Sequence, residues 1–192
     1  MDNQTYRAID QIALSLCEVI NVDRRNRKSI EAIQTAMLGL LKEKPLEKII
    51  MTEIAQRADI NRSTLYSYFD NPQEVFSSLV EKSIAALNEQ LGDKKYTMTE
   101  FIRLYLRHMK NHYIVYREIH RHNITDSHVL QIAEIMNEHT VGTKLIPDSI
   151  KAKYCFYGFF GVAAEWLENG CKEKTEHIIE ELMPIMELFD IV

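Results

Sequence analysis

The sequence predicts an all-α protein, and three observations support that prediction. Apolar residues recur at three- and four-residue spacing along most of the chain, as in helices that bury one face. No segment alternates apolar and polar residues as a half-buried strand would. Only 6 glycines and 4 prolines occur among 192 residues, so the tight turns of a sandwich or barrel are scarce.

The elements follow in order from the apolar stripes and from residues that start or stop helices. Asn71 can cap the helix that Pro72 begins, and Gly92 can end it. Pro184 should kink or break the last helix. The expected helices cover about residues 8–21, 30 to the Pro45 region, 52–58, 62–69, 72–91, 98–121, 126–140, 148–169 and 175–189.

Composition and charge limit the class of function. The net charge of −5 argues against a protein that coats nucleic acid by general basicity. However, seven Lys or Arg and three Glu lie within residues 24–48, a local charge of +4. Cys17, Cys155 and Cys171 form no CxxC pair, the first residues lack a signal-peptide pattern, and no apolar run reaches the ~20 residues of a membrane span. A cytoplasmic protein with no membrane partner is expected.

The segment MTEIAQRADINRSTLYSYF, residues 51–69, has the internal spacing of a helix-turn-helix. Ala55 is small where two short helices must cross. Asp59 occupies the turn, where the backbone is left-handed and Asp is one of the few tolerated residues besides Gly. Leu65 and Phe69 point inward. The side chains left to face a DNA major groove are Arg62, Ser63, Tyr66, Ser67 and Tyr68. An ordinary helical hairpin fits the same spacing.

Residues 24–80 resemble the DNA-binding domain of the tetracycline-repressor (TetR) family of bacterial regulators. The most specific segments are EIAQRADINRSTLYSYF and the helix started by Asn71-Pro72. The resemblance implies a homodimer whose recognition helices enter successive major grooves of a pseudo-palindromic operator in double-stranded DNA. It assigns DNA contacts to a basic arm before the first family helix, to one residue of the next short helix and to the recognition helix: Arg24, Arg25, Arg27, Thr52, Arg62, Ser63, Thr64, Tyr66 and Tyr68.

Two functions remain open under this resemblance. One is a ligand-responsive repressor, and the other is a dimeric coactivator or adaptor that works through a partner protein with little DNA binding of its own. Three positions differ from the usual family residues: Ile50 replaces Thr, Asp59 replaces Gly, and Pro72 replaces a Lys that commonly contacts phosphate. The expected domains are an N-terminal helical extension (1–22), the DNA-binding domain (23–82) and an effector-binding and dimerisation domain (83–192).

Aromatic side chains in the second half of the chain can line a cavity for a small-molecule effector, although core packing explains them equally well. The candidates are Phe101, Tyr105, Tyr113, Tyr116 and Trp166.

The helix expected over 148–169 is apolar nearly all round between Tyr154 and Leu167, so both of its faces should be buried. One face can pack on its own subunit and the other on a second copy. The segment YGFFGVAAEWLENG also resembles the dimerising end of one subgroup of the family. The candidates for a homodimer interface through the last two helices are Tyr157, Phe159, Phe160, Ala164, Leu182 and Met186.

His108 and His112 lie four residues apart on an expected helix, the spacing of a zinc or nickel pair. A solvated helix face explains them as well, and no metal or other cofactor is assigned. The motifs GxSxG, GxxxxGKS and HExxH do not occur in the sequence, so an enzyme is not expected.

Overall fold

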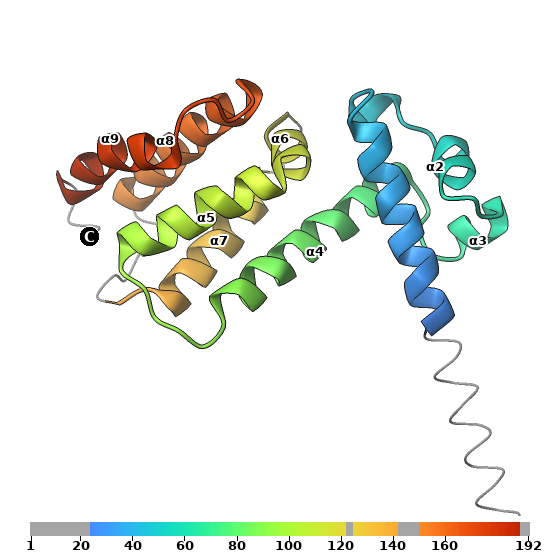
Figure 1. Cartoon of the computed structure of the whole chain (residues 1–192), viewed down its shortest axis with the longest axis horizontal. Coiled ribbons are helices and arrows are strands. Elements are labelled where there is room, and N and C mark those ends of the chain that lie inside the picture. The colour runs from blue at the N-terminus through green and yellow to red at the C-terminus, as the bar shows by residue number, and fades with distance from the viewer. Residues whose placement is uncertain (1–23, 122–124, 142–149, 189–192) are drawn as a thin grey trace, which may run out of the picture. The chain divides into compact units, whose positions relative to one another are not determined.

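A computed structural model describes residues 24–121, 125–141 and 150–188 (Figure 1). Within these ranges every element is helical, and the only β pairing is an isolated bridge between Tyr96 and Thr140. The all-α prediction is confirmed. The helix expected over 8–21, the extension over 1–22 and Cys17 lie outside the described residues.

The described elements begin with a helix over residues 24–41, and all the elements that follow it except η1 are labelled in Figure 1. The elements that follow are η1 (Leu46–Lys48), α2 (Met51–Arg57), α3 (Arg62–Tyr66), α4 (Pro72–Leu91), α5 (Met98–Asn111), α6 (Tyr113–Arg121), α7 (Thr125–His139), α8 (Ile150–Glu168) and α9 (Thr175–Leu188). No described helix is long and apolar enough to cross a membrane.

Two helix boundaries differ from the sequence predictions, and α9 is not broken at Pro184. Residues 24–41 are helical, so the arginines near residue 24 lie within a helix rather than in an arm before it. The helix expected over 62–69 ends at Tyr66, because Tyr68 N–H bonds to the Leu65 carbonyl only three residues back, at 3.0 Å, and the α-helical pattern stops there. Helix α9 continues through Pro184. Because proline has no N–H, the carbonyl four residues earlier lacks its helical donor, and water can supply one since Pro184 is exposed.

The single helix expected over 98–121 is instead α5 and α6, separated at His112. Tyr105 of α5 and Ile114 of α6 are both buried. At about 100° per residue, a continuous helix would place these two side chains about 180° apart. The break at His112 therefore lets both apolar stripes reach the core. This break depends on tertiary packing, so the local spacing of apolar residues does not predict it.

Helix α4 begins as its sequence predicts. The Asn71 side chain accepts a hydrogen bond from Glu74 N–H at 2.9 Å, and Glu74 accepts one from Asp70 N–H at 2.8 Å. This reciprocal capping satisfies two backbone donors and fixes the entry into the helix.

The chain divides into two compact units, Met1–Ser78 and Leu79–Val192, with the division inside α4. The first unit buries Met37, Ile54 and Leu65 between its short helices. The second unit buries a largely aromatic core that includes Phe101, Tyr105 and Tyr116. Each unit therefore has its own hydrophobic core.

Candidate nucleic-acid interface and ligand cavity

Helices α2 and α3 form the predicted helix-turn-helix. Asp59 has a φ of 53°, the left-handed conformation expected at the turn. Ile60 N–H bonds to the Ala55 carbonyl at 3.1 Å and closes the turn, while Leu65 is fully buried beneath α3. Asn61 caps α3 by accepting a hydrogen bond from Ser63 N–H at 3.3 Å. The geometry of a helix-turn-helix is thus complete.

The residues predicted to contact DNA fall into two groups by exposure. Tyr66 is 52% exposed, although it is large and aromatic. The other exposed members are Arg24, Arg25, Arg27, Arg62, Ser63 and Ser67, and the half-buried members are Thr52, Thr64 and Tyr68. The start of α3 therefore presents a cation and hydroxyl groups to solvent, which suits contacts with phosphates and base edges.

Tyr68 differs from the other candidates because its hydroxyl already has a partner inside the protein. It donates a hydrogen bond to Asn26 Oδ1 at 2.8 Å. The bond joins the turn after α3 to the helix over 24–41. Sequence reasoning missed Asn26, because nothing in the local pattern links it to a residue 42 positions away.

Helix α2 begins without a capping side chain at Ile50, the position where the family usually has Thr. Ile50 is 56% exposed and offers no side-chain acceptor, so it cannot cap the helix. Glu53 accepts a hydrogen bond from Ile50 N–H at 3.1 Å and also pairs with Lys44. The hydrogen bond from Lys44 and then that from Ile50 lower the pKa of the Glu53 carboxyl. Glu53 thereby supplies half of a capping box without a capping hydroxyl.

The second unit contains a buried polar cluster amid aromatic rings. Ser83 Oγ of α4 lies 3.0 Å from His108 Nε2 of α5, and Tyr105 Oη lies 3.2 Å from His128 Nε2 of α7. Tyr116 lies between the two pairs, with ring centroids 5.8 Å from His108 and 5.4 Å from His128. The cluster thus links helices α4 to α7 through polar and aromatic contacts.

Burial keeps these histidines neutral near pH 7. It lowers the pKa of His108 to about 4, helped by the nearby His112, and lowers the pKa of His128 to about 4, helped by His120 and His108. The His108 and His112 rings stack with centroids 4.4 Å apart. No group of three or more His, Cys, Asp or Glu suited to hold a metal occurs among the described residues.

A cavity of about 30 Å³ lies among α5, α7, α8 and α9. Of the five predicted pocket residues, Phe101 and Tyr105 line it. Tyr116 is buried outside its wall, with its ring 5.9 Å from Tyr105. Tyr113 is exposed, and Trp166 is a buried residue whose indole N–H donates to the Glu173 carbonyl at 3.0 Å. The last three therefore do not line this cavity.

Sequence reasoning missed most of the cavity wall. The missed residues are Ile102, Ile132, Met136, Cys155, Phe156, Phe159, Phe160 and Met186. Three of them, Phe159, Phe160 and Met186, were expected in the dimer interface, but they are buried within their own subunit. Periodicity predicts that α8 is apolar, but it does not tell which of its faces meets the core of the same subunit.

The outer face of α8 carries apolar residues that its own subunit leaves exposed. We define this outer face as Ile150, Tyr154, Tyr157, Gly158, Gly161 and Val162. No described atom lies within 4 Å of a Cβ built on either glycine, so the backbone there is open to close approach. Of the predicted interface residues, Tyr157 is exposed, whereas Ala164 and Leu182 are half-buried.

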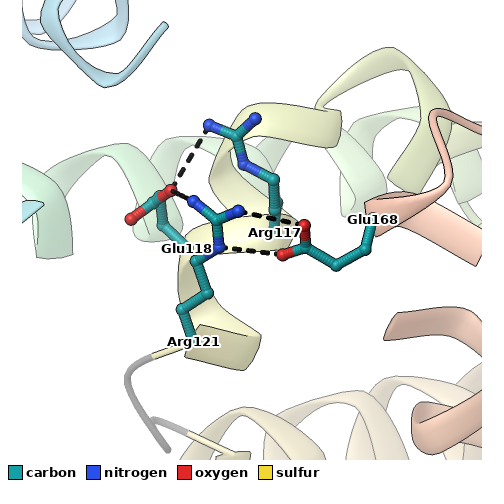
Figure 2. Close-up of polar contacts among 4 residues, drawn as sticks. All are labelled: Arg117, Glu118, Arg121 and Glu168. Atoms are coloured by element: carbon teal, nitrogen blue, oxygen red, sulfur yellow. Dashed lines mark hydrogen bonds and ion pairs between the residues drawn. The ribbon is translucent and has the colours of Figure 1, made fainter. Parts of the chain in front are cut away.

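Helices α6 and α8 are joined by a charged network (Figure 2). Glu118 is fully buried and accepts hydrogen bonds from Arg117 at 3.4 Å and from Arg121 at 3.2 Å. Arg121 also makes a bidentate pair with Glu168 of α8, at 2.8 and 2.9 Å. Two arginines thus compensate one buried carboxylate and one exposed carboxylate.

Comparison with known proteins follows the division of the chain. Residues 33–79 match the family described as bacterial regulatory proteins, tetR family, and residues 96–188 match a transcriptional regulator C-terminal region. The HTH-type dhaKLM operon transcriptional activator DhaS of Lactococcus lactis subsp. lactis (strain IL1403) is 31% identical over 96 residues, which are 48% of this chain and 51% of DhaS.

A second curated relative is the uncharacterized HTH-type transcriptional regulator YxbF of Bacillus subtilis (strain 168). It is 31% identical over 71 residues, which are 36% of this chain and 19% of YxbF. The chain therefore spans about half the length, or less, of these relatives. Among solved structures, the dihydroxyacetone kinase operon activator DhaS has a TM-score of 0.62 at 21% identity, covering 85% of this chain and 96% of that chain. This likeness shows the fold alone.

The helix-turn-helix and the helical second unit together have the architecture of a transcriptional regulator. The matches to both parts of the chain make the assignment specific. The chain belongs to the TetR family of transcriptional regulators, whose members bind DNA operators as homodimers.

Proposed function

We propose that this chain is a homodimeric regulator that reads a pseudo-palindromic operator with α3 and responds to a small-molecule effector bound in its second unit. The proposed DNA-reading domain comprises residues 23–82, and the proposed effector and dimerisation domain comprises residues 83–192. The observation that supports DNA reading best is the exposed start of α3, where Arg62, Ser63 and Tyr66 face solvent above the buried Leu65.

The contacts sort into two roles by side-chain chemistry. Arg62 at the first turn of α3 can make a bidentate contact with a guanine edge. The Tyr66 hydroxyl and the arginines of the helix over 24–41 suit phosphate oxygens. Tyr68 has its hydroxyl proton committed to Asn26 at 2.8 Å, so we assign it to positioning the helix over 24–41 against the turn after α3.

The test is a selection of bound fragments from genomic DNA, followed by affinity measurement on the selected operator over a range of salt concentrations. A steep fall in affinity with rising salt and a pseudo-palindromic sequence are expected. Arg62→Ala should relax preference at particular base pairs, with about 1–3 kcal/mol lost for a good bidentate contact. Arg107→Ala, an exposed arginine of α5, is the matched control and should change neither property.

If Arg62→Ala lowers the salt slope by about one and leaves sequence preference intact, its contact is with a phosphate. Unchanged affinity and salt dependence in folded Arg62→Ala, Tyr66→Phe and Arg25→Ala dimers would remove the DNA-reading role from this surface.

A second function, that of a dimeric coactivator or adaptor, is favoured by two departures from the usual family residues, of which the one at Pro72 removes an expected phosphate contact. Ile50 and Pro72 occupy positions where the family usually has Thr and Lys. The likeness to DhaS, a transcriptional activator, accords with either function. If no genomic fragment is retained at low salt, the adaptor function is the one to pursue, and reconstitution of transcription with purified partner proteins tests it.

We propose that the homodimer forms through the outer face of α8, together with the exposed Ile185 of α9. This face carries large apolar side chains that are exposed in the subunit, and its two glycines allow close helix approach. Phe159 and Phe160 are not part of the proposal, because both are buried in the subunit core.

A further inference from the structure

The cavity of the second unit has a wall built almost entirely from apolar side chains. Helix α5 contributes Phe101, α7 contributes Ile132 and Met136, and α8 and α9 contribute Phe159 and Met186. Its volume of about 30 Å³ exceeds the ~10–15 Å³ that one water needs. A cavity lined in this way stays dry, so its wall lacks dispersion contacts that a bound molecule would supply.

Within the part of the wall that the structure describes, no side chain is placed to stabilise a charge. Among the described lining residues, only Tyr105 and Cys155 carry polar side-chain atoms. The Tyr105 hydroxyl is already bonded to His128 at 3.2 Å, and burial holds the pKa of His128 at about 4, so that ring is neutral near pH 7. A carboxylate or ammonium group placed here would lose its hydration without gaining a partner, which is strongly unfavourable.

We propose that this cavity binds a small, uncharged, apolar alkyl or aryl molecule, and that the effector of the regulator belongs to this chemical class. The regulatory role of the bound molecule rests on the proposed function, whereas its binding to the cavity does not depend on DNA.

The wall can enlarge to accept such a molecule. Met136 and Met186 are unbranched and flexible, so they can change rotamer at low cost. The surrounding aromatic rings already contact one another at their edges and faces, with the Phe159 and Phe160 centroids 5.4 Å apart. An aryl ligand would extend this packing. Tyr105 and Phe160 both line the cavity and contact His128, so occupancy can reach the polar cluster through them.

The experiment compares toluene with benzoate, which has a similar ring but carries a carboxylate. At about ten times its Kd, toluene should raise the Tm of the full-length protein by about 3–6 °C, whereas benzoate at equal concentration should not. Ile132→Phe fills the cavity and should abolish the toluene shift. Leu130→Phe, an exposed position on the same helix, is the matched control and should retain it.

Thiol alkylation gives a second readout that does not require a folded variant. Toluene should slow alkylation of Cys155, which lines the cavity, and leave the rate at Cys171, which does not, unchanged. Peptide mass spectrometry separates the two sites.

Three results would overturn the proposal: no toluene binding up to its solubility limit, benzoate binding as well as toluene, or equal toluene effects on both thiols. Retention of toluene by a folded Ile132→Phe protein would do the same. DNA retention is measured separately, so a protein that binds toluene but no DNA supports the cavity and counts against the regulator.

Discussion

At the scale of single residues, hydrogen-bond partners divide the two tyrosines near the end of α3 into different roles. Tyr66 is exposed, while the Tyr68 hydroxyl donates to Asn26 Oδ1. A phosphate oxygen can only accept a hydrogen bond, so Tyr68 would have to give up Asn26 to bind one. The sequence pattern predicts both tyrosines as DNA contacts, and only the hydrogen bond to Asn26 distinguishes Tyr68 from Tyr66.

Removal of each hydroxyl tests this division. Tyr66→Phe should weaken binding to all DNA sequences alike, because a phosphate contact carries no sequence information. Tyr68→Phe and Asn26→Ala should weaken binding to a similar extent, and the double variant should be no worse than either single one. Operator titrations of the four proteins measure this. Additive losses for Tyr68 and Asn26 would mean that they act independently.

At the scale of elements, the second unit depends on polar groups that join its helices. The polar cluster connects α4, α5, α6 and α7 through Ser83, His108, Tyr116 and His128. The charged network of Figure 2 connects α6 to α8. Buried polar groups that are satisfied fix helix register, whereas loss of one partner leaves the other buried without compensation.

The buried histidines predict a pH dependence of stability. His108 and His128 have a folded-state pKa of about 4, below the ordinary value of 6.5. Between these values the unfolded chain binds more protons, so the free energy of unfolding should fall as the pH drops from about 6.5 to 4. The loss approaches about 3 kcal/mol for each group.

Urea unfolding at several pH values measures this dependence. His128→Gln keeps an acceptor for Tyr105 and should reduce the slope by up to about 1.4 kcal/mol per pH unit, the value for one proton. His177→Gln, at an exposed position of α9, is the control. Equal slopes in both variants and the natural protein would show that His128 is not buried neutral.

The charged network predicts that neutralising its two carboxylates lowers the free energy of unfolding by different amounts. Glu118→Gln removes the charge that faces Arg117 and Arg121 and should lower the free energy of unfolding by roughly 2–3 kcal/mol, near the lower bound for a broken buried pair because both arginines are partly exposed. Glu168→Gln removes an exposed partner and should cost at most about 1 kcal/mol. Equal costs in urea unfolding would contradict the assigned role of burial.

At the scale of the whole molecule, different residues of α8 serve dimer assembly and subunit folding under the proposed interface. The outer face of α8 is exposed in the subunit, while Phe159 and Phe160 on the same helix fill its core. Replacement of outer-face residues should therefore alter assembly and leave the subunit folded. Replacement of the two phenylalanines should unfold it.

Tyr157→Glu combined with Val162→Glu should give folded monomers in sedimentation experiments, because charges in a dry interface lose hydration without partners. Lys153→Glu, an exposed change at the start of α8, is the charge control and should leave the dimer intact. Operator affinity should fall with dimer loss, because the monomer holds only one half-site. A folded dimer in the double variant would place the interface elsewhere.

The sequence by itself determined the all-α class, the helix-turn-helix with left-handed Asp59, and the capped start of α4, because each follows from residues close together in the chain. Only the tertiary structure decided the break at His112, the Asn26–Tyr68 bond and the cavity wall. Periodicity shows that α8 is apolar on both sides, but not which side faces its own core. That choice depends on packing between helices distant in sequence, which places Phe159 at the cavity and leaves Tyr157 exposed.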